Sequence, residues 1–174
     1  MLRTEKIFLC MIPSTYSHFN LFIFASHHFL RMKSKTLAER VFDTMYNNDL
    51  FSQWLGIERV LVEEGKCVLK MFVRKEMLNG FDIAHGGICY SLADSALAFA
   101  SNSHGRKAVS VETSISLTEQ VKVDDVLTAT AEEISLTNKI GVYYVTVTNQ
   151  ENKKVAFFKG TVYKTSKDWF PENK

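Results

Sequence analysis

Cysteine is scarce in this sequence of 174 residues, which contains only Cys10, Cys67 and Cys89. None of the three stands in a CxxC or other metal-ligand spacing, and an odd number does not indicate a disulfide framework. The five histidines form no HExxH or similar pattern either. We therefore expect no disulfide scaffold, no metal site and no bound cofactor, and a reducing cytoplasm is the simplest location.

Long apolar runs and an excess of charge of one sign are also missing. No run approaches the roughly 20 apolar residues that a helix needs to cross a bilayer. The formal net charge is +2, which implies no polybasic surface. We expect neither nucleic acid nor a membrane as a partner. The chain is long enough for one domain with a sizeable core.

Residues 1–31 differ from the rest of the chain. They combine a basic start with short apolar runs that Pro13 and Ser/His clusters interrupt. A secretory signal needs an unbroken apolar stretch and a small-residue cleavage site, and neither is clear. From Met32 onward the sequence is typical of an ordinary cytoplasmic start. We expect 1–31 to be a mis-assigned upstream extension or a disordered tail rather than a targeting segment, and 32–174 to be a single domain.

The rest of the chain is organised around residues 77–105. A polar loop with glycines leads into an Ala- and Leu-rich stretch from Gly87, which predicts a helix that ends near Gly105. Apolar residues recur at spacings of three and four, and small apolar residues cover other faces, so we expect a nearly enclosed helix. Asp94 lies in the middle of this helix. It is either exposed or capped, or it faces a cleft as a catalytic carboxylate, because burial without a partner is costly.

The segment before this helix, His85-Gly86-Gly87, favours the catalytic interpretation of Asp94. Glycines at a helix N-terminus let a ligand approach the backbone closely. The free N–H groups there point outward at the positive end of the helix dipole. Such groups suit the oxyanion that develops when a thioester is attacked.

Three motifs resemble those of the hotdog-fold acyl-CoA thioesterases, in particular the phenylacetate-degradation (PaaI-type) branch, which hydrolyses hydroxyphenylacetyl-CoA. They are His85-Gly86-Gly87, Leu92-Ala93-Asp94-Ser95-Ala96 and Asn102-Ser103. The resemblance runs from about Leu37 to Trp169. It implies an α+β hotdog fold, in which an antiparallel sheet wraps around one long helix. It also implies an acyl-CoA substrate, of which coenzyme A is a part rather than a cofactor. The sequence departs from the family at Asp124-Asp125, where Gly-Asp is usual.

The remaining elements agree with this layout. Thr36-Leu37-Ala38-Glu39 is a capping box that begins an amphipathic helix over about 37–47. Apolar patterns predict strands over 57–63, 66–73, 109–117, 126–136, 141–148 and 155–164. The order helix, two strands, loop, long helix, four strands suits an α+β architecture. We expect the tail 166–174 to pack loosely around Trp169.

The spacing of Gly86 and Asp94 predicts an active site shared between chains. The two residues are eight positions apart, which is about 12 Å along a helix, so one carbonyl cannot contact both within the same helix. If Gly86 donates its N–H to the thioester oxygen while Asp94 acts as general base or nucleophile, the two come from different chains. The family builds its sites in the same way. We predict a homodimer with shared sites that pairs further into a homotetramer.

The resemblance implies roles for three more residues of this region. Asn79 would hold the attacking water, although Asn-Gly by itself indicates only a turn. His85 either orients the loop, contacts the substrate or is purely structural. Gly87 is expected to contact the substrate beside Gly86.

The acyl group is expected to enter near Phe51, Trp54 and Tyr90. Phe51 and Trp54, together with Leu55, are also candidates for core anchors, and that simpler role is favoured. Cys89 is expected to pack rather than to act as a nucleophile, because no basic partner for it is evident in the sequence. The phosphates of coenzyme A need basic residues, for which only generic candidates exist: Lys139, Lys154 and Lys159.

Two other functions compete with thioester hydrolysis. A non-catalytic hotdog module would bind acyl-CoA and regulate another process, but such a binder has no need of Asp94. A hotdog dehydratase usually shows an Asp/His pair in a different motif, which is not found here. The acyl group itself stays open between hydroxyphenylacetyl, phenylacetyl, benzoyl and medium-chain acyl.

Overall fold

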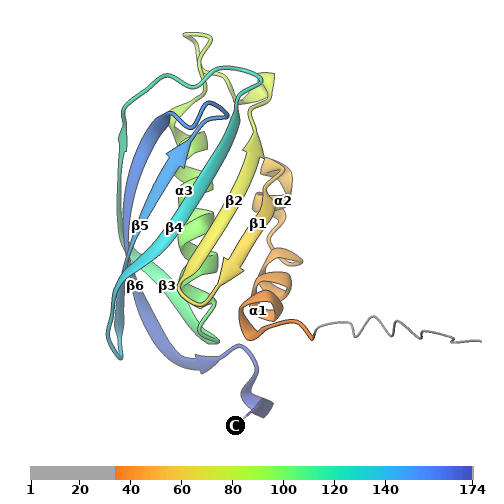
Figure 1. Ribbon diagram of the computed structural model, residues 1–174, viewed down its shortest axis with the longest axis vertical. Coiled ribbons are helices and arrows are strands. Elements are labelled where there is room, and N and C mark those ends of the chain that lie inside the picture. The colour runs from red at the N-terminus through yellow and green to blue at the C-terminus, as the bar shows by residue number, and fades with distance from the viewer. Residues whose placement is uncertain (1–33, 174) are drawn as a thin grey trace, which may run out of the picture. The chain divides into compact units, whose positions relative to one another are not determined.

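The first helix begins where the capping box predicts it. The computed structural model describes residues 34–173 (Figure 1), and the segment 1–31 discussed above lies outside them. In α1 (Leu37–Tyr46) the Thr36 hydroxyl accepts the Glu39 N–H at 3.2 Å, and the Glu39 carboxylate accepts the Thr36 N–H at 2.7 Å. Both donors are thereby satisfied at the start of the helix.

The short helix α2 (Leu50–Leu55) is an element that the apolar pattern does not predict. Asp49 caps it by accepting the Ser52 N–H at 3.0 Å, and Gly56 ends it at a φ of 73°. Leu55 is fully buried, as expected of a core anchor, but Phe51 and Trp54 are 54% and 58% exposed. The anchor prediction is therefore wrong for both aromatic residues, because so short a helix turns only one face to the core.

The six predicted strands are all present and form one sheet. They are β1 (Glu58–Glu63), β2 (Lys66–Phe72), β3 (Arg106–Leu117), β4 (Val126–Leu136), β5 (Ile140–Thr148) and β6 (Lys154–Asp168). Their order is β1-β2-β4-β5-β6-β3, and all neighbours are antiparallel. This order leaves β1 and β3 as the two edges of the sheet.

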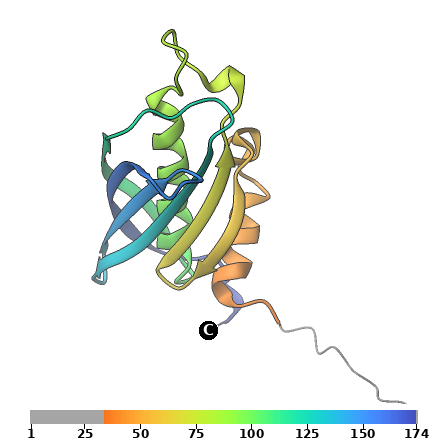
Figure 2. The ribbon, with the colours of Figure 1, turned by 45° about the horizontal axis from the view of Figure 1, so that its top comes forward.

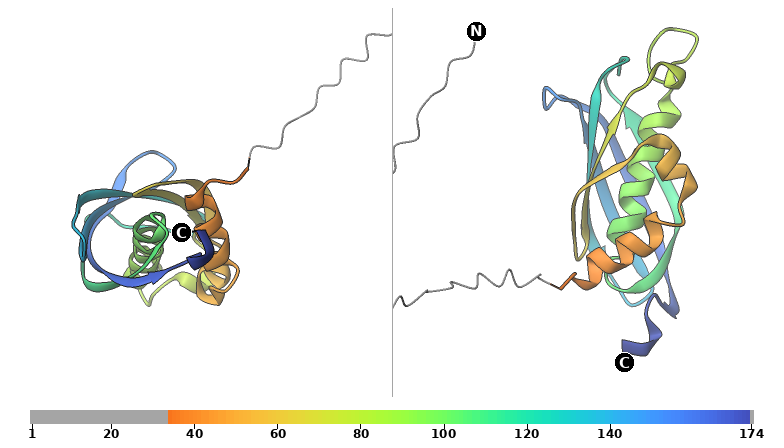
Figure 3. Two further views of the ribbon diagram at one scale, coloured as in Figure 1. Left: turned by 90° about the horizontal axis from the view of Figure 1, so that it is seen from below. Right: turned by 90° about the vertical axis from the view of Figure 1, so that its right-hand side faces the viewer.

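The long helix α3 (Gly86–Asn102) lies along the concave face of this sheet (Figure 3). Apolar residues on several of its faces are buried: Leu92, Ala93, Ala96, Leu97, Phe99 and Ala100. The sheet comes very close to the helix at Gly160, where an added Cβ would lie 2.4 Å from Leu97 Cδ2. α1 covers the helix on another side, with the Phe42 and Phe99 rings 4.3 Å apart. The enclosed helix and the wrapped antiparallel sheet are those of the predicted hotdog architecture.

The C-terminal tail is ordered against the rest of the fold, so the expectation of loose packing is wrong. β6 continues to Asp168, which pairs with Arg106, and the Trp169 N–H donates to the Gly105 carbonyl at 2.8 Å. The Arg40 guanidinium lies 4.2 Å from the centre of the Phe170 ring. The tail lies at the end of the molecule opposite the β2–α3 loop (Figure 2). None of the helices within residues 34–173 is long and apolar enough to cross a membrane.

Asp124 stands where the resemblance implies glycine, and its backbone has a conformation that favours glycine. Its φ of 70° lies in the left-handed region, which costs a non-glycine residue roughly 1–2 kcal/mol, less for aspartate. Glycine would remove this strain but lose about 0.5–1 kcal/mol of chain entropy. We expect Asp124→Gly to stabilise the protein by up to about 1 kcal/mol in urea unfolding. Gly80→Ala serves as a comparison, since an added Cβ there meets no atom within 4 Å.

Candidate active site

The N-terminus of α3 presents one free backbone donor. His85 is its N-cap, and the His85 Nδ1 atom accepts the Gly87 N–H at 3.0 Å. The His85 carbonyl accepts the Ile88 N–H at 2.8 Å. Within the described residues, the Gly86 N–H donates to no acceptor. His85 therefore has a structural capping role, and the Gly87 N–H is already engaged. Gly86 is left as the donor that a ligand can reach.

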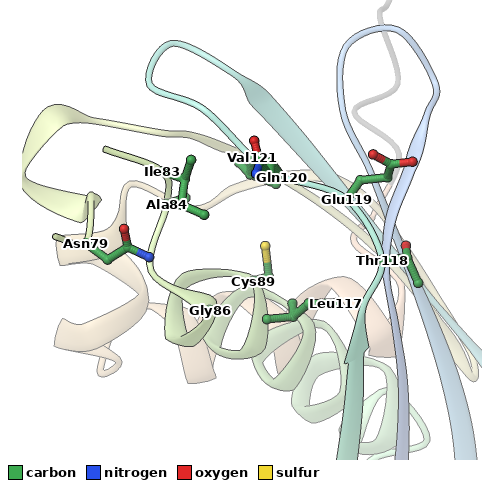
Figure 4. Close-up of a pocket in the computed structure, with 10 residues that line it drawn as sticks. All are labelled: Asn79, Ile83, Ala84, Gly86, Cys89, Leu117, Thr118, Glu119, Gln120 and Val121. Carbon is green, nitrogen blue, oxygen red and sulfur yellow. The ribbon is translucent and has the colours of Figure 1, made fainter. Parts of the chain in front are cut away.

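A cavity of about 500 Å³ lies beside Gly86 (Figure 4). Its walls come from the β2–α3 loop, the first turns of α3 and the segment that follows β3. The lining residues are Asn79, Ile83, Ala84, Gly86, Cys89, Leu117, Thr118, Glu119, Gln120 and Val121. The fold thus brings Asn79 and Gly86 to one site, as the resemblance implies.

Asn79 is held in this wall by its own turn. Its side-chain carbonyl accepts the Phe81 N–H at 2.8 Å, and its backbone N–H donates to the Ile83 carbonyl at 2.8 Å. The turn predicted from Asn-Gly is therefore real, but the side-chain Nδ2 group donates to no acceptor among the described residues. That amide nitrogen is available to a water molecule or a substrate in the cavity.

Cys89 lines the same cavity with its thiol directed inward (Figure 4). The side chain is buried, and burial raises the pKa of the thiol to about 11. Among the described residues, no basic group offsets this effect of burial on the pKa. A thiol that stays protonated is a poor nucleophile, which supports packing as the role of Cys89.

Asp94 lies at a second cavity, of about 420 Å³, farther along α3. Its carboxylate is half-buried and makes no hydrogen bond or ion pair with any described residue. Burial raises the pKa of this carboxyl group above its ordinary value. The structure therefore places Asp94 at a cleft rather than in a capped or fully exposed position. An unpaired, partly desolvated carboxylate in a cleft is a candidate functional group.

The two cavities have no lining residue in common. Gly86 and Asp94 lie on one continuous helix, about 12 Å apart along its axis. Within a single chain, one thioester carbonyl therefore cannot reach both groups.

Ser110 is a polar residue of the Asp94 cavity that the sequence pattern does not reveal. The alternation along β3 puts Ser110 on the same face as Glu112. In the structure, however, the register with β6 shifts between Ser110 and Glu112. A bulge of this kind changes which face a residue occupies. Met45 of α1 and Trp169 of the tail also line this cavity and could be placed only by the tertiary fold.

The residues predicted to receive the acyl group are not assembled within one chain. Phe51, Trp54 and Tyr90 line neither of the two cavities. The Tyr90 hydroxyl shares a hydrogen bond with Thr113 Oγ1, and its ring packs edge-on against Phe158 at 5.5 Å. Their role as acyl contacts stays a prediction.

The three lysines considered for the phosphates of coenzyme A do not line either cavity. Lys159 pairs with Glu112 at 3.2 Å, while Lys139 and Lys154 lie over the rings of Tyr163 and Phe157. These contacts support the interpretation that they are solvated surface charges. Within residues 34–173, no three His, Cys, Asp or Glu side chains are grouped so as to hold a metal ion.

The enclosed helix and the wrapped sheet define the hotdog class of fold, and the free glycine N–H and the unpaired carboxylate suit a hydrolase of that class. The chain belongs to the thioesterase superfamily, whose sequence pattern matches residues 81–156. A protein of Archaeoglobus fulgidus is 42% identical over 139 residues, which are 80% of this chain and 90% of its own length. The acyl-coenzyme A thioesterase PaaI of Escherichia coli K12 is 41% identical over 116 residues, or 67% of this chain and 83% of that protein.

Solved structures give the same family. The structure of the E. coli PaaI protein from the phenylacetic acid degradation operon matches with a TM-score of 0.75 and 37% identity. The match covers 76% of this chain and 96% of that chain. A protein of Streptococcus mutans bound to acetyl CoA matches with a TM-score of 0.63 and 30% identity, over 64% of this chain and 90% of its own.

Proposed function

We propose that this protein hydrolyses acyl-CoA thioesters to a free acid and coenzyme A. The observation that carries the proposal is the Asp94 carboxylate, which stands unpaired at a cavity on the central helix of a thioesterase fold. A folded protein does not keep such a group for stability, because desolvating a charge without a partner is costly.

In this mechanism the Gly86 N–H donates to the thioester carbonyl oxygen as negative charge develops on it. Asp94 removes a proton from water while the water oxygen bonds to the carbonyl carbon, and Asn79 holds that water. The C–S bond then breaks, the leaving sulfur takes the proton that Asp94 had accepted, and coenzyme A leaves as the thiol while Asp94 returns to its ionised form. In the alternative, Asp94 itself attacks to form an anhydride, which water opens. His85 keeps the glycine turn in place by capping α3.

The site is proposed to lie between two chains. Gly86 of one chain would meet Asp94 of the other, since the two do not meet within one helix. β3 offers a surface for this association: it is a sheet edge, and Val109 and Val111 on it are 55% and 59% exposed. An unpaired edge strand with exposed apolar residues is prone to pair with another chain. Pairing of dimers into a homotetramer and a cytoplasmic location stay predictions.

Release of coenzyme A, measured with a thiol-trapping reagent, tests the proposed activity. The panel contains hydroxyphenylacetyl-, phenylacetyl-, benzoyl- and medium-chain acyl-CoA, and the assay uses the full chain. We favour aryl and aryl-acetyl thioesters, because the E. coli PaaI relative is named an acyl-coenzyme A thioesterase and the solved E. coli PaaI protein comes from the phenylacetic acid degradation operon. Binding of acyl-CoA without any release would favour the non-catalytic module instead.

Mixing two inactive variants tests whether the site is shared. In a heterodimer of Asp94→Asn and Gly86→Pro chains, one site contains both defects and the other contains an intact Gly86 and an intact Asp94. After the two variants are unfolded and refolded together, we expect about a quarter of wild-type activity, since half the dimers are mixed and each has one working site. Each variant refolded alone is the control. A mixture no more active than these controls would contradict the shared site.

A further inference from the structure

The cavity beside Asp94 has the character of an acyl-group pocket. Its apolar lining residues are drawn from α1, α3, β3, β6 and the tail: Met45, Leu97, Ala98, Ala108, Val109, Val162 and Trp169. Besides Asp94, its polar lining residues are Ser101, Asn102, Lys107 and Ser110. Its volume of about 420 Å³ is within the range of small-ligand pockets. An apolar acyl group entering here would bring its thioester end next to Asp94.

Trp169 stands at the other end of this cavity. Its indole Nε1–H donates to Asn102 Oδ1 at 2.8 Å. Asn102 follows Asp94 by eight positions on α3, which places the indole contact about 12 Å from the carboxylate along the helix axis. The tail and the last turn of α3 lie at the same end of the molecule (Figure 1). Asp94 and Trp169 therefore mark opposite ends of one cavity.

The position of the Trp169 ring is fixed by several contacts. Asn102 is itself tied down, because its amide donates to the Ala98 carbonyl at 2.9 Å and its Oδ1 accepts the Ala108 N–H at 3.0 Å. The Trp169 backbone N–H donates to the Gly105 carbonyl, and the Lys107 ammonium lies 4.6 Å from the centre of the ring. A partly buried indole N–H with a partner and a cation over the ring favour one orientation of an aromatic side chain. The ring is therefore a rigid wall rather than a mobile flap.

We propose that Trp169 is the end wall of the acyl pocket and sets the length of the acyl group that reaches Asp94. The proposal rests on the proposed thioesterase function. It assigns specificity to a residue of the C-terminal tail, in place of the expected contacts Phe51, Trp54 and Tyr90. In an apolar pocket, one methylene more or less changes kcat/KM by about 10–200-fold, so a wall of this kind produces a sharp length limit.

The test compares kcat/KM over a series of acyl-CoA substrates from butyryl to dodecanoyl for wild type, Trp169→Ala and Trp169→Phe. We expect Trp169→Ala to raise the dodecanoyl-to-butyryl ratio by about tenfold or more, while Trp169→Phe keeps a ring in place and preserves the wild-type order. Trp54→Ala makes the same chemical change at an exposed tryptophan outside the cavity. Phe157→Ala, at an exposed position of β6 that does not line the cavity, is the neutral control.

The dodecanoyl-to-butyryl ratio of kcat/KM distinguishes a residue that walls the pocket from one that only stabilises the fold. Loss of the Asn102 contact by itself would lower the melting temperature and depress kcat/KM for all substrates together. A Trp169→Ala ratio within about twofold of wild type, or a shift produced by Trp54→Ala instead, would overturn the proposal.

A binding series keeps the inference separate from the proposed activity. S-alkyl-CoA thioethers of the same lengths cannot be hydrolysed, and calorimetry gives their affinities. We expect Trp169→Ala to bind the longest thioether more tightly, relative to the shortest, than wild type does. If wild type hydrolyses no substrate, the proposed function fails, and the affinity series alone decides the role of Trp169. If Trp169→Ala then binds the thioethers in the same order of affinity as wild type, the role of Trp169 as a wall is wrong.

Discussion

Asp94→Asn should abolish most of the hydrolysis of any acyl-CoA that the wild-type protein accepts. The amide is close in size to the carboxylate but can neither take a proton from water nor attack the thioester. General base catalysis contributes about 10²–10⁴-fold, so we expect kcat to fall by about a hundredfold or more. Coenzyme A release measures the loss. Cys89→Ser, which changes a polarisable group in the other cavity without removing a base, should keep far more activity than Asp94→Asn.

The pH dependence of kcat/KM should report the ionisation of the Asp94 carboxyl group. Burial raises the pKa of the Asp94 carboxyl group, and only its ionised form acts as base or nucleophile. The acidic limb of kcat/KM should therefore lie above the range of an ordinary aspartate. An acidic limb at the ordinary position, or a hydrolysis rate that Asp94→Asn leaves unchanged, would contradict the assignment.

The same substitution should stabilise the fold at neutral pH. A carboxyl group whose pKa is raised in the folded state binds its proton more tightly there than in the unfolded chain. Its favourable contribution is fully present below the unfolded pKa and is lost as the pH rises through the folded pKa. At neutral pH the ionised, unpaired carboxylate therefore opposes folding. Asp94→Asn should raise the melting temperature at pH 7, and the difference should shrink in acid.

Gly86→Pro should lower the hydrolysis rate nearly as much as Asp94→Asn does, because it removes the backbone N–H donor. Proline has no N–H, and the first position of a helix is the one that tolerates it best. His85, which would precede the proline, already has the extended ψ of 135° that such a residue requires. Loss of one oxyanion donor typically lowers kcat by about 10²–10³-fold. We expect a fall of that size in coenzyme A release, with the helix retained in circular dichroism.

Gly86→Ala separates the donor from the added bulk. Both variants bring a Cβ atom that would lie 2.7 Å from Leu117 Cδ1, at the flexible end of that side chain. Alanine keeps the N–H and proline does not. If the two variants lose activity equally, the effect comes from the clash with Leu117, and the donor role of Gly86 is wrong.

Local patterns in the sequence were sufficient for most elements of the fold. The capping box at Thr36 and Glu39 places the start of α1, because its hydrogen bonds join residues only three positions apart. The apolar spacing of α3 predicts its enclosure, and the apolar pattern of residues 126–136 predicts the bounds of β4. α2 was missed because a six-residue helix is too short to show a period, and it is defined by the Asp49 cap and by Gly56.

What depended on neighbours far along the chain was not visible in the sequence. The bulge in β3 that involves Ser110 arises from pairing with β6, and the order of the tail arises from the contacts of Trp169 with Asn102 and Gly105. These partners are separated in sequence by tens of residues, so neither a local apolar period nor a helix-capping motif predicts their contacts. The exposure of Phe51 and Trp54 also depends on tertiary packing, since hydrophobicity alone does not determine which face of a helix meets the core.

The sequence by itself indicated the class of this protein, because the glycine turn, the helix that follows it and the acid within that helix form one continuous segment that resembles the motifs of the hotdog thioesterases. The spacing of Gly86 and Asp94 even showed that one helix cannot bring both to one carbonyl. Only the tertiary structure decided which cavity each group faces, and which residues wall those cavities. Cavity walls are assembled from side chains of several elements, and their shape follows from packing across the whole core.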